Sequence, residues 1–157
     1  MKWLWLLDME LEEAIKGRKS IRHYVDLPIS NEDIEKLIWA GSKVPSAGGC
    51  HPLRFYIIKD KEAKDRLCHA ALNQNCISEA YAVIMICADY SKIVKRYHRR
   101  GYRYTFMEAG HVGQNISLMA VQLGLGCVMI GAFRDADVKE VLGIEEDPLY
   151  LIPIGRI

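Results

Sequence analysis

The sequence lacks the features that define several large classes of protein. It has no apolar run long enough to span a bilayer, because the opening run, Trp3 to Leu7, is short and is followed by acidic residues. Lys and Arg number 21 against 20 Asp and Glu, which gives a formal net charge of +1. This balance provides no overall attraction to nucleic acid or to anionic surfaces. We therefore expect neither a membrane partner nor a nucleic-acid partner.

Motifs for metal sites, phosphate loops and catalytic triads are also missing. The five cysteines form no C-x-x-C pair and no zinc spacing with histidine, and the five histidines show no H-E-x-x-H pattern. No phosphate-loop motif and no nucleophile turn of a Ser-His-Asp or Cys-His enzyme occurs. We expect no metal, and an odd number of free thiols in a reducing cytoplasm.

What the chain does have is the composition of one globular domain. It contains 157 residues, of which 50% are hydrophobic and 26% are charged. A chain of this length can bury most of its apolar surface in a single core. We assign residues 1–157 to one domain, with residues 1–8 as an extra N-terminal arm.

Residues 104–123 are predicted to form a long helix that carries almost no charge. Its small residues recur every three or four positions and so share one face: Ala109, Gly113, Ser117 and Ala120. Gly124 follows where a left-handed cap would end the helix. Two interpretations remain open. The helix is buried in the core of one chain, or its small face meets the same face of a second copy across a two-fold axis.

Glu108 is the only acid in this helix, and His111 lies three residues further along. This spacing places both side chains on neighbouring positions of the helix surface. We interpret them as a hydrogen-bonded pair buried in the core rather than as a catalytic pair.

Two stretches before the middle of the chain are candidates for binding a ligand. In Arg18-Lys19-Ser20-Ile21-Arg22, an extended backbone would project alternate residues from one side, which suits a phosphate or polyol. The alternative is an exposed basic loop. Pro45-Ser46-Ala47-Gly48-Gly49 and the following residues cannot be a helix or a central strand, and their small side chains let a flat ligand approach backbone amides.

A basic and aromatic stretch, residues 89–103, permits a second interpretation of the chain. Arginine and lysine alternating with tyrosine is typical of proteins that bind single-stranded nucleic acid. Because the rest of the chain balances these charges, we favour an amphipathic lid whose charges are solvated.

The remaining pattern predicts alternating helices and strands. Ser30, with Asp33 three residues later, is expected to begin a helix. Further elements are expected as helices over 61–71 and 135–142 and as strands over 54–59, 80–88, 126–133 and 150–154.

In order, these segments resemble the nitroreductase family of flavin-dependent oxidoreductases over nearly the whole chain. The motifs that carry the resemblance are Arg18-Lys19-Ser20-Ile21-Arg22, Pro45-Ser46-Ala47-Gly48 with Pro52, Glu108-Ala109-Gly110-His111 with Gln114-Asn115, Gly124-Leu125-Gly126, Ile130-Gly131-Ala132-Phe133 and Leu151-Ile152-Pro153-Ile154-Gly155. The arginines and tyrosines of residues 96–104 are similar to the branch that contains azoline dehydrogenases. Gly49 and His51 depart from the residues common in the family.

The resemblance implies an α+β fold, with a mostly antiparallel central sheet flanked by helices, in an intertwined homodimer that holds flavin mononucleotide (FMN) at the subunit interface. It implies that Arg18 and Ser20 hold the phosphate and ribityl chain, that Lys19 is also among the cofactor-binding residues, and that Arg22 lies near the flavin ring and tunes it. The partner subunit would supply Pro45, Ser46, Ala47, Gly48 and Gly49. Ile130 and Gly131 would present backbone to the ring, and Arg156 would add a charge at the phosphate.

The activity that this resemblance implies is a two-electron reduction driven by NAD(P)H, in which FMN carries the hydride and no side chain is catalytic. The acceptor would be a small molecule of the nitroaromatic or quinone type, which replaces NAD(P)H after it leaves. Two alternatives remain: a dehydrogenase that acts on a specific azoline-like substrate, or a flavin carrier or sensor without turnover.

Overall fold

The computed structural model describes residues 9–157, so the predicted N-terminal arm, residues 1–8, lies outside the described residues. The helices are α1 (Leu11–Gly17), α2 (Asn31–Ser42), α3 (Lys61–Ala70), α4 (Cys76–Glu79), α5 (Ser91–Tyr97), α6 (Arg100–Gln122) and α7 (Asp135–Leu142), with a 3-10 turn, η1 (Ala47–Gly49). The strands are β1 (Leu53–Ile58), β2 (Ala82–Ala88), β3 (Leu125–Cys127) and β4 (Asp147–Arg156).

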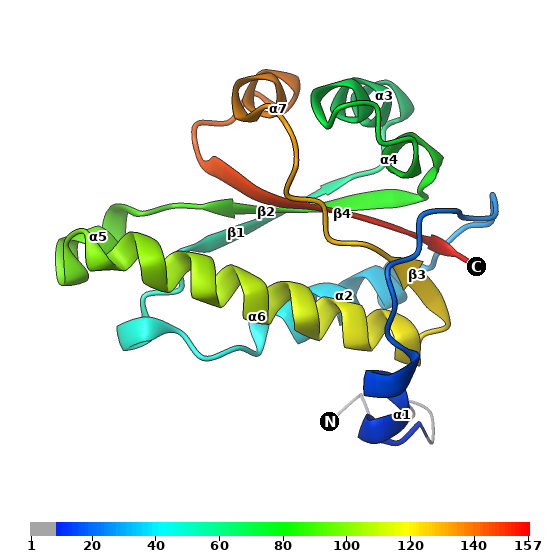
Figure 1. The fold of residues 1–157 in the computed structure, drawn as a ribbon, viewed down its shortest axis with the longest axis horizontal. Helices are drawn as coiled ribbons and strands as arrows, with labels where there is room; N and C mark the ends of the chain where they lie inside the picture. The colour runs from blue at the N-terminus through cyan, green and yellow to red at the C-terminus, as the bar shows by residue number, and fades with distance from the viewer. Residues whose placement is uncertain (1–8) are drawn as a thin grey trace.

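The described strands form one antiparallel sheet in the order β1-β2-β4-β3. Helices α2 and α6 cover one face of this sheet, and α3, α4 and α7 cover the other (Figure 1). Every residue of β2 is buried, since this strand is covered on both faces. The predicted fold class, an antiparallel sheet flanked by helices, is confirmed.

Alternate residues of β2 supply the two halves of the hydrophobic core. Ile84 and Ile86 face α2 and α6, whereas Val83, Met85 and Cys87 face the opposite helices. This alternation follows from the pleat, which turns successive side chains to opposite faces. All five cysteines are free thiols, as predicted.

The small-residue face of α6 packs inside the subunit. Ala109 and Ala120 are almost fully buried, and Ser117 donates a hydrogen bond to the Gly113 carbonyl at 2.8 Å. A Cβ atom placed on Gly113 would lie 2.1 Å from the Met129 sulfur, so this face is already occupied by the chain's own residues. The hypothesis that this face meets a second copy is therefore wrong, and the core-helix interpretation is correct.

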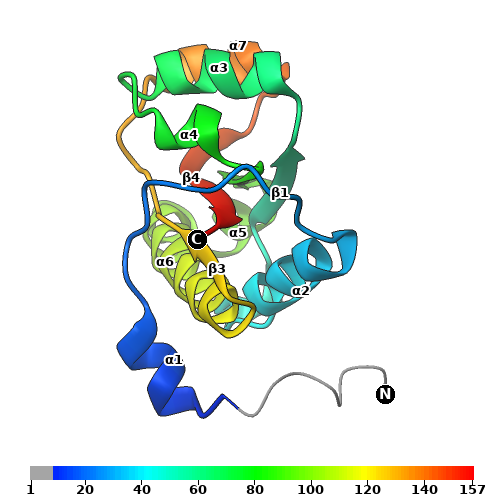
Figure 2. The ribbon, with the colours of Figure 1, turned by 90° about the vertical axis from the view of Figure 1, so that its right-hand side faces the viewer.

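The segment after α1 crosses the sheet at a pair of glycines. Gly126 and Gly155 are partners in the register of β3 and β4. A Cβ atom on Gly126 would lie 2.7 Å from an Ile21 methyl group, and one on Gly155 would lie 2.5 Å from the Tyr24 ring. The two glycines thus let the chain pass over the end of β3 and β4, as Figure 2 shows.

Most of the predicted elements are confirmed, with shifted boundaries. Ser30 accepts a hydrogen bond from the Asp33 amide and begins α2, and Gly124 takes a left-handed φ of 66° after α6. The predicted strand over 126–133 is too long, because β3 ends at Cys127 and only Ile130 pairs again, with Leu151. Within residues 9–157, no helix combines the length and apolar character needed to cross a bilayer.

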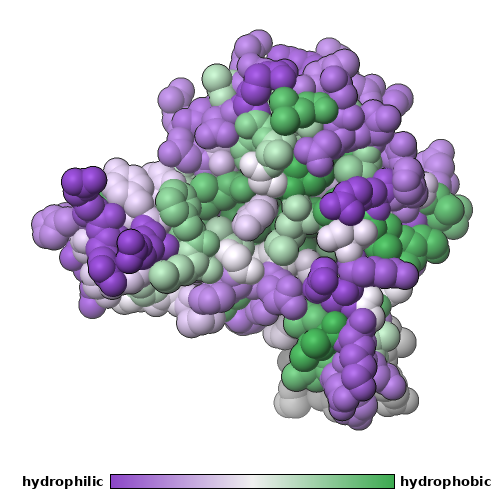
Figure 3. Space-filling model, viewed as in Figure 1, coloured by the Kyte–Doolittle hydropathy of each residue, from purple (hydrophilic) through white to green (hydrophobic). Residues whose placement is uncertain are grey.

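The basic stretch over residues 89–103 forms α5 and the first turn of α6. Gly101 allows these helices to meet, since a Cβ atom there would lie 2.9 Å from the Ile93 carbonyl oxygen. Hydrophilic residues gather at this end of the molecule in Figure 3. Within this stretch, Arg96 donates a hydrogen bond to the Gly48 carbonyl at 3.1 Å. At least one basic residue of the stretch is therefore bonded to the protein rather than only solvated.

Candidate functional site

The segment over residues 18–25 lies along the sheet at the C-terminal end of α6. The Ile21 amide donates to the Cys127 carbonyl at 2.9 Å, and the Val25 amide donates to the Arg156 carbonyl at 3.0 Å. These bonds hold the extended backbone that the sequence predicted. They position a groove of about 660 Å³, lined by Lys19, Ser20, Ile21, Arg22, His23, Tyr24, Val25 and Ile157.

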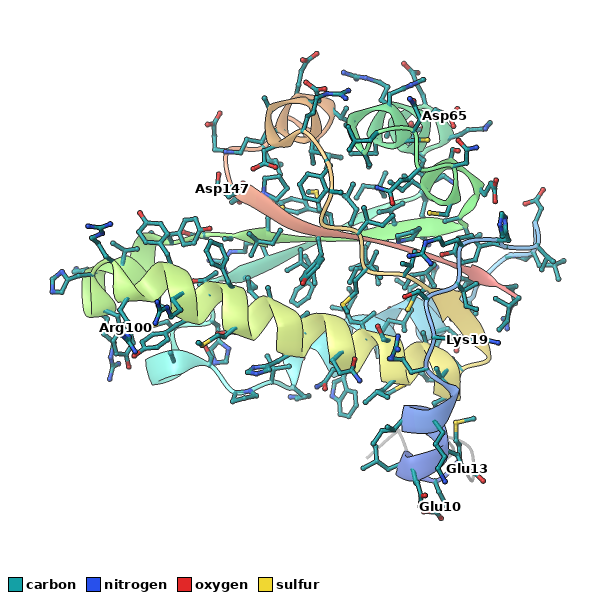
Figure 4. The ribbon with its side chains drawn as sticks, viewed as in Figure 1. Glu10, Glu13, Lys19, Asp65, Arg100 and Asp147 are labelled. Carbon is teal, nitrogen blue, oxygen red and sulfur yellow. The ribbon has the colours of Figure 1, made fainter. Side chains whose placement is uncertain are left out.

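Three of the predicted site residues, Lys19, Ser20 and Arg22, line this groove. Figure 4 shows Lys19 beside β3 and the C-terminal end of α6. The positive charge of Arg22 acts on Cys76 of α4 and lowers the pKa of its thiol, although burial raises that pKa more strongly. Arg22 therefore lies on the α4 side of the groove.

The other two predicted arginines do not line the groove. Arg18 is half-buried, and its charge reaches the Cys127 thiol, whose pKa burial raises overall. The Arg156 guanidinium donates to the Pro28 carbonyl at 3.3 Å and lies 3.8 Å from the Asp33 carboxylate. Arg156 thus shares its charge with the start of α2, and its contact with a phosphate stays a prediction.

The loop of residues 45–51, between α2 and β1, is wound tightly. Gly48 and Gly49 have φ values of 57° and 64°, and His51 has 46°, in the left-handed region. The Ser46 side-chain oxygen accepts a hydrogen bond from the His51 amide at 2.9 Å. A Cβ atom on Gly48 would lie 2.6 Å from the Tyr97 hydroxyl, so α5 rests directly on this loop.

The two predicted halves of the site lie apart within one chain. The loop over 45–49 contacts α5 near the N-terminal end of α6. Residues 18–22 instead lie beside β3, at the C-terminal end of α6 (Figure 1). Helix α6 spans 23 residues, which corresponds to about 35 Å at 1.5 Å per residue. One chain alone therefore does not bring the two halves together.

The backbone at Ile130 and Gly131 is only partly free. The amide and carbonyl of Ile130 both pair with Leu151, each at 2.9 Å. The Ile130 amide is therefore already paired within the subunit, and a contact of the Ile130 backbone with the flavin stays a prediction. Gly131 is exposed and its amide has no partner among residues 9–157, so a contact through Gly131 stays a prediction.

Glu108 and His111 do not form the buried, hydrogen-bonded pair that was predicted for this helix. The Glu108 side chain is 4% exposed, whereas His111 is exposed and acts on it only through its charge. A hydrogen bond from Ser46 and the positive charges of His51 and His111 lower the pKa of Glu108, but burial raises it more. Glu108 is the only charged residue among residues 104–123 apart from His111, and this isolation was the signal for a buried carboxyl group.

Comparison with known proteins places these features in a family. The model of the Nitroreductase family matches residues 15–79 and 68–156. A protein of Methanocaldococcus jannaschii that is named as a nitroreductase is 35% identical, in an alignment that covers 95% of this chain and 92% of that protein. The FMN reductase [NAD(P)H] of Bacillus subtilis is 27% identical over 94% of this chain and 64% of its own length.

Solved structures agree with the sequence comparisons. The NADPH:FMN oxidoreductase of Vibrio harveyi, solved in complex with NAD+, superposes with a TM-score of 0.84 at 26% identity, over 93% of this chain and 68% of that chain. A structure from Parabacteroides distasonis, named as an NADH dehydrogenase/NAD(P)H nitroreductase, gives a TM-score of 0.82 at 30% identity and covers 92% of this chain and 85% of that one. Fold, motifs and family match agree, and the chain belongs to the nitroreductase family.

Proposed function

We propose that the protein is an FMN-dependent oxidoreductase that uses NAD(P)H to reduce a small organic acceptor of the nitroaromatic or quinone type. Family membership supports this proposal, as do relatives named as an FMN reductase and an NADPH-flavin oxidoreductase. FMN and NAD(P)H are accordingly the cofactors of the proposed reaction, and a cytoplasmic location stays a prediction.

The groove over residues 19–25 has the chemistry that FMN requires. Lys19, Ser20 and Arg22 offer two cations and a hydroxyl to a phosphate and polyol chain, and Ile21, Val25 and Ile157 offer an apolar surface. Cations, a hydroxyl and an apolar surface within one groove suit the phosphate, the ribityl chain and the ring of the cofactor. This match is the observation that carries the assignment of FMN to these residues.

A complete site requires the small-residue loop as well, and we infer that a second copy supplies it. The face of α6 that points away from its own sheet carries apolar side chains: Tyr102, Phe106 and Met107 are 43%, 55% and 55% exposed. Such a face favours contact with another chain. A two-fold axis across this face would bring the loop over 45–49 of one copy toward the groove of the other.

Within this site, the protein supplies position and charge. Bound FMN would supply the redox chemistry, which is hydride transfer from NAD(P)H and two-electron reduction of the acceptor. Lys19 and Ser20 would hold the phosphate and ribityl groups, and Arg22 would place a positive charge near the ring. The Gly131 amide would be free to donate a hydrogen bond to the ring. Preorganised donors of this kind commonly contribute a few kcal/mol each.

The absorbance spectrum of the purified protein tests the proposal. We expect a yellow protein, or one that becomes yellow with FMN, whose visible absorbance is bleached by NADH or NADPH and restored by a quinone. A preparation that stays colourless after incubation with FMN would contradict it. A yellow protein that neither nicotinamide bleaches would indicate a flavin carrier or sensor.

A further inference from the structure

Helix α5 and the first turn of α6 carry positive charge that no acid balances. Residues 91–104 contain six basic residues and no Asp or Glu, whereas the rest of the chain has 15 Lys and Arg against 20 Asp and Glu. All six side chains are exposed, and none forms an ion pair with an acidic side chain of residues 9–157. Such a cluster attracts an anion to this end of the molecule. Its members are Lys92, Lys95, Arg96, Arg99, Arg100 and Arg103.

Tyrosine rings hold two of these arginines. The guanidinium carbon of Arg96 lies over the Tyr97 ring, 5.5 Å from its centre, and that of Arg100 lies over the Tyr104 ring, 5.8 Å from its centre. The two rings meet edge to face with their centres 5.2 Å apart, and they thereby join α5 to α6. A guanidinium group that rests on a ring is held in place, while the N–H donors at its edge stay available.

Arg100 has the greater capacity for a ligand. Within residues 9–157, its guanidinium makes the contact with the Tyr104 ring but donates no hydrogen bond, so its N–H donors are free. Arg103 lies one helical turn further along α6, at a spacing that places it beside Arg100 on the helix surface. Figure 4 shows Arg100 at the N-terminal end of α6.

These arginines lie beside the loop over 45–49. Arg96 donates a hydrogen bond to the Gly48 carbonyl at 3.1 Å, and a Cβ atom on Gly48 would lie 2.8 Å from the Arg96 guanidinium carbon. The proposed function assigns this loop to the flavin site of the partner subunit. The cationic cluster therefore borders the same proposed site.

We propose that Arg100 binds the 2′-phosphate of NADPH, with Arg96 and Arg103 adding positive charge, and that the enzyme consequently prefers NADPH to NADH. This inference rests on the proposed function, in which NAD(P)H reduces FMN. Hydride transfer requires the nicotinamide ring to contact the flavin ring, so the adenosine end of the cofactor extends away from it toward the border of the site.

The chemistry of the cluster selects a phosphate monoester. The 2′-phosphate is the group that NADPH carries and NADH lacks, and its oxygens accept hydrogen bonds from a guanidinium fork in pairs. Single-stranded nucleic acid fits less well, because bases need open ring faces on which to stack. Here the Tyr97 and Tyr104 rings contact each other and each carries a guanidinium group over it.

Two nucleotide fragments test the proposal by isothermal titration calorimetry on the FMN-loaded protein. Adenosine 2′,5′-bisphosphate corresponds to the adenosine end of NADPH, and 5′-AMP corresponds to that of NADH. We expect the bisphosphate to bind at least about tenfold more tightly, through hydrogen bonds between charged groups. This advantage should shrink as salt is added, because exposed charges are screened. Equal affinities, or no binding of either fragment, would overturn the proposal.

Variants locate the phosphate. Arg100→Gln should bring the ratio of the two affinities close to one, and Arg100→Lys, which keeps the charge but not the fork, should retain part of it. Arg66→Gln, which removes a half-exposed guanidinium on α3, should leave the ratio as in the native chain. A native ratio in Arg100→Gln would overturn the assignment, as would tighter binding of a single-stranded thymidine oligonucleotide than of the bisphosphate.

Reduction of the bound flavin separates this inference from the proposed function. We expect kcat/KM for NADPH to exceed that for NADH at least about tenfold, by the same hydrogen bonds. Equal values for NADPH and NADH would overturn the inference and leave the proposed function standing. If neither nicotinamide reduces the flavin, the proposed function fails, and the fragment titrations still decide whether Arg100 binds a 2′-phosphate.

Discussion

Glu108 is a single acid held among apolar side chains, and its protonation should be visible in stability. Burial raises the pKa of Glu108 in the folded chain, so the folded state binds this proton more tightly than the unfolded chain does. The stabilisation that results is fully present below the ordinary glutamate pKa of about 4.3 and is lost as the pH rises through the raised pKa.

Glu108→Gln should therefore gain stability relative to the native chain as the pH rises above about 4.3. Urea unfolding of both proteins at a series of pH values measures this difference. Glu140→Gln serves as the control, because the Glu140 side chain is 78% exposed and its substitution should leave the pH dependence unchanged. Parallel stability curves for the native chain and Glu108→Gln would contradict the prediction.

Arg22 is the residue through which the groove should act on the flavin. Arg22→Ala should weaken FMN binding by about tenfold or more, because a hydrogen bond to a charged group contributes about 1.5–3 kcal/mol. Quenching of FMN fluorescence on titration measures the affinity. Arg66→Ala, which removes a half-exposed guanidinium on α3, is the matched control. Equal FMN affinity in the two variants would remove Arg22 from the site.

For single residues, the sequence indicated which side chains have the chemistry of a binding site, but not which other residues they contact. Lys19, Ser20 and Arg22 were predicted from cations and a hydroxyl in an extended segment, and the structure places all three along one groove, whereas their contact with FMN stays a prediction. The partner of Glu108 could not, since Ser46 is 62 positions away and reaches Glu108 only through the folded loop. His111, at the expected spacing, points to solvent instead.

Among the elements, the segment that crosses β3 and β4 is the most sensitive to small changes. A methyl group at Gly155 would overlap the Tyr24 ring, whose hydroxyl donates to the Ile21 and Pro153 carbonyls. Gly155→Ala should therefore cost about 1–3 kcal/mol of stability through overpacking. It should also weaken FMN binding, because the displaced segment carries Ser20 and Arg22.

A double-mutant cycle separates this overlap from a general effect on the strand. The cost of Gly155→Ala should shrink when Tyr24 is already alanine, since the ring that the methyl group meets is gone. Chemical denaturation of the four proteins gives the coupling free energy. Additive costs would show that Tyr24 is not the obstacle.

Helices and strands were largely predictable because local signals set their ends. Ser30 and Gly124 mark boundaries through capping and a left-handed φ, which depend on neighbours in the sequence. The strand expected over 126–133 is interrupted after Cys127, and it pairs with β4 again at Ile130, which faces Leu151 in the same register as β3. Such a pairing between distant residues leaves no local pattern.

For the whole molecule, the dimer is the prediction with the largest consequence. Phe106→Glu places a charge on the exposed apolar face of α6, where a desolvated carboxylate would oppose association. We expect a monomer by light scattering, together with loss of bound FMN. Leu72→Glu, at a 58% exposed position after α3, should leave both unchanged. A Phe106→Glu dimer that retains FMN would contradict the proposed interface.

The periodicity of α6 indicated a small-residue face and a second apolar face. It could not indicate which face packs against the chain's own sheet and which is free to contact another chain. Small residues suit close packing against any partner, and here the partner is the Met129 side chain of the same chain. The apolar residues of the opposite face, Phe106 and Met107, were the signal that remained for a second copy.

The separation of the groove and the small-residue loop by the length of α6 implies that two defective proteins can repair each other. Two variants serve as the defective chains, Arg22→Ala and Gly48→Val, and each should lose activity when it is alone. The valine strains the loop, because Gly48 has a φ of 57°, which a residue with a side chain rarely adopts. When the two are unfolded together and refolded, half of the assemblies should pair unlike chains. Each such hybrid has one site with both defects and one with neither, so about a quarter of native activity should return.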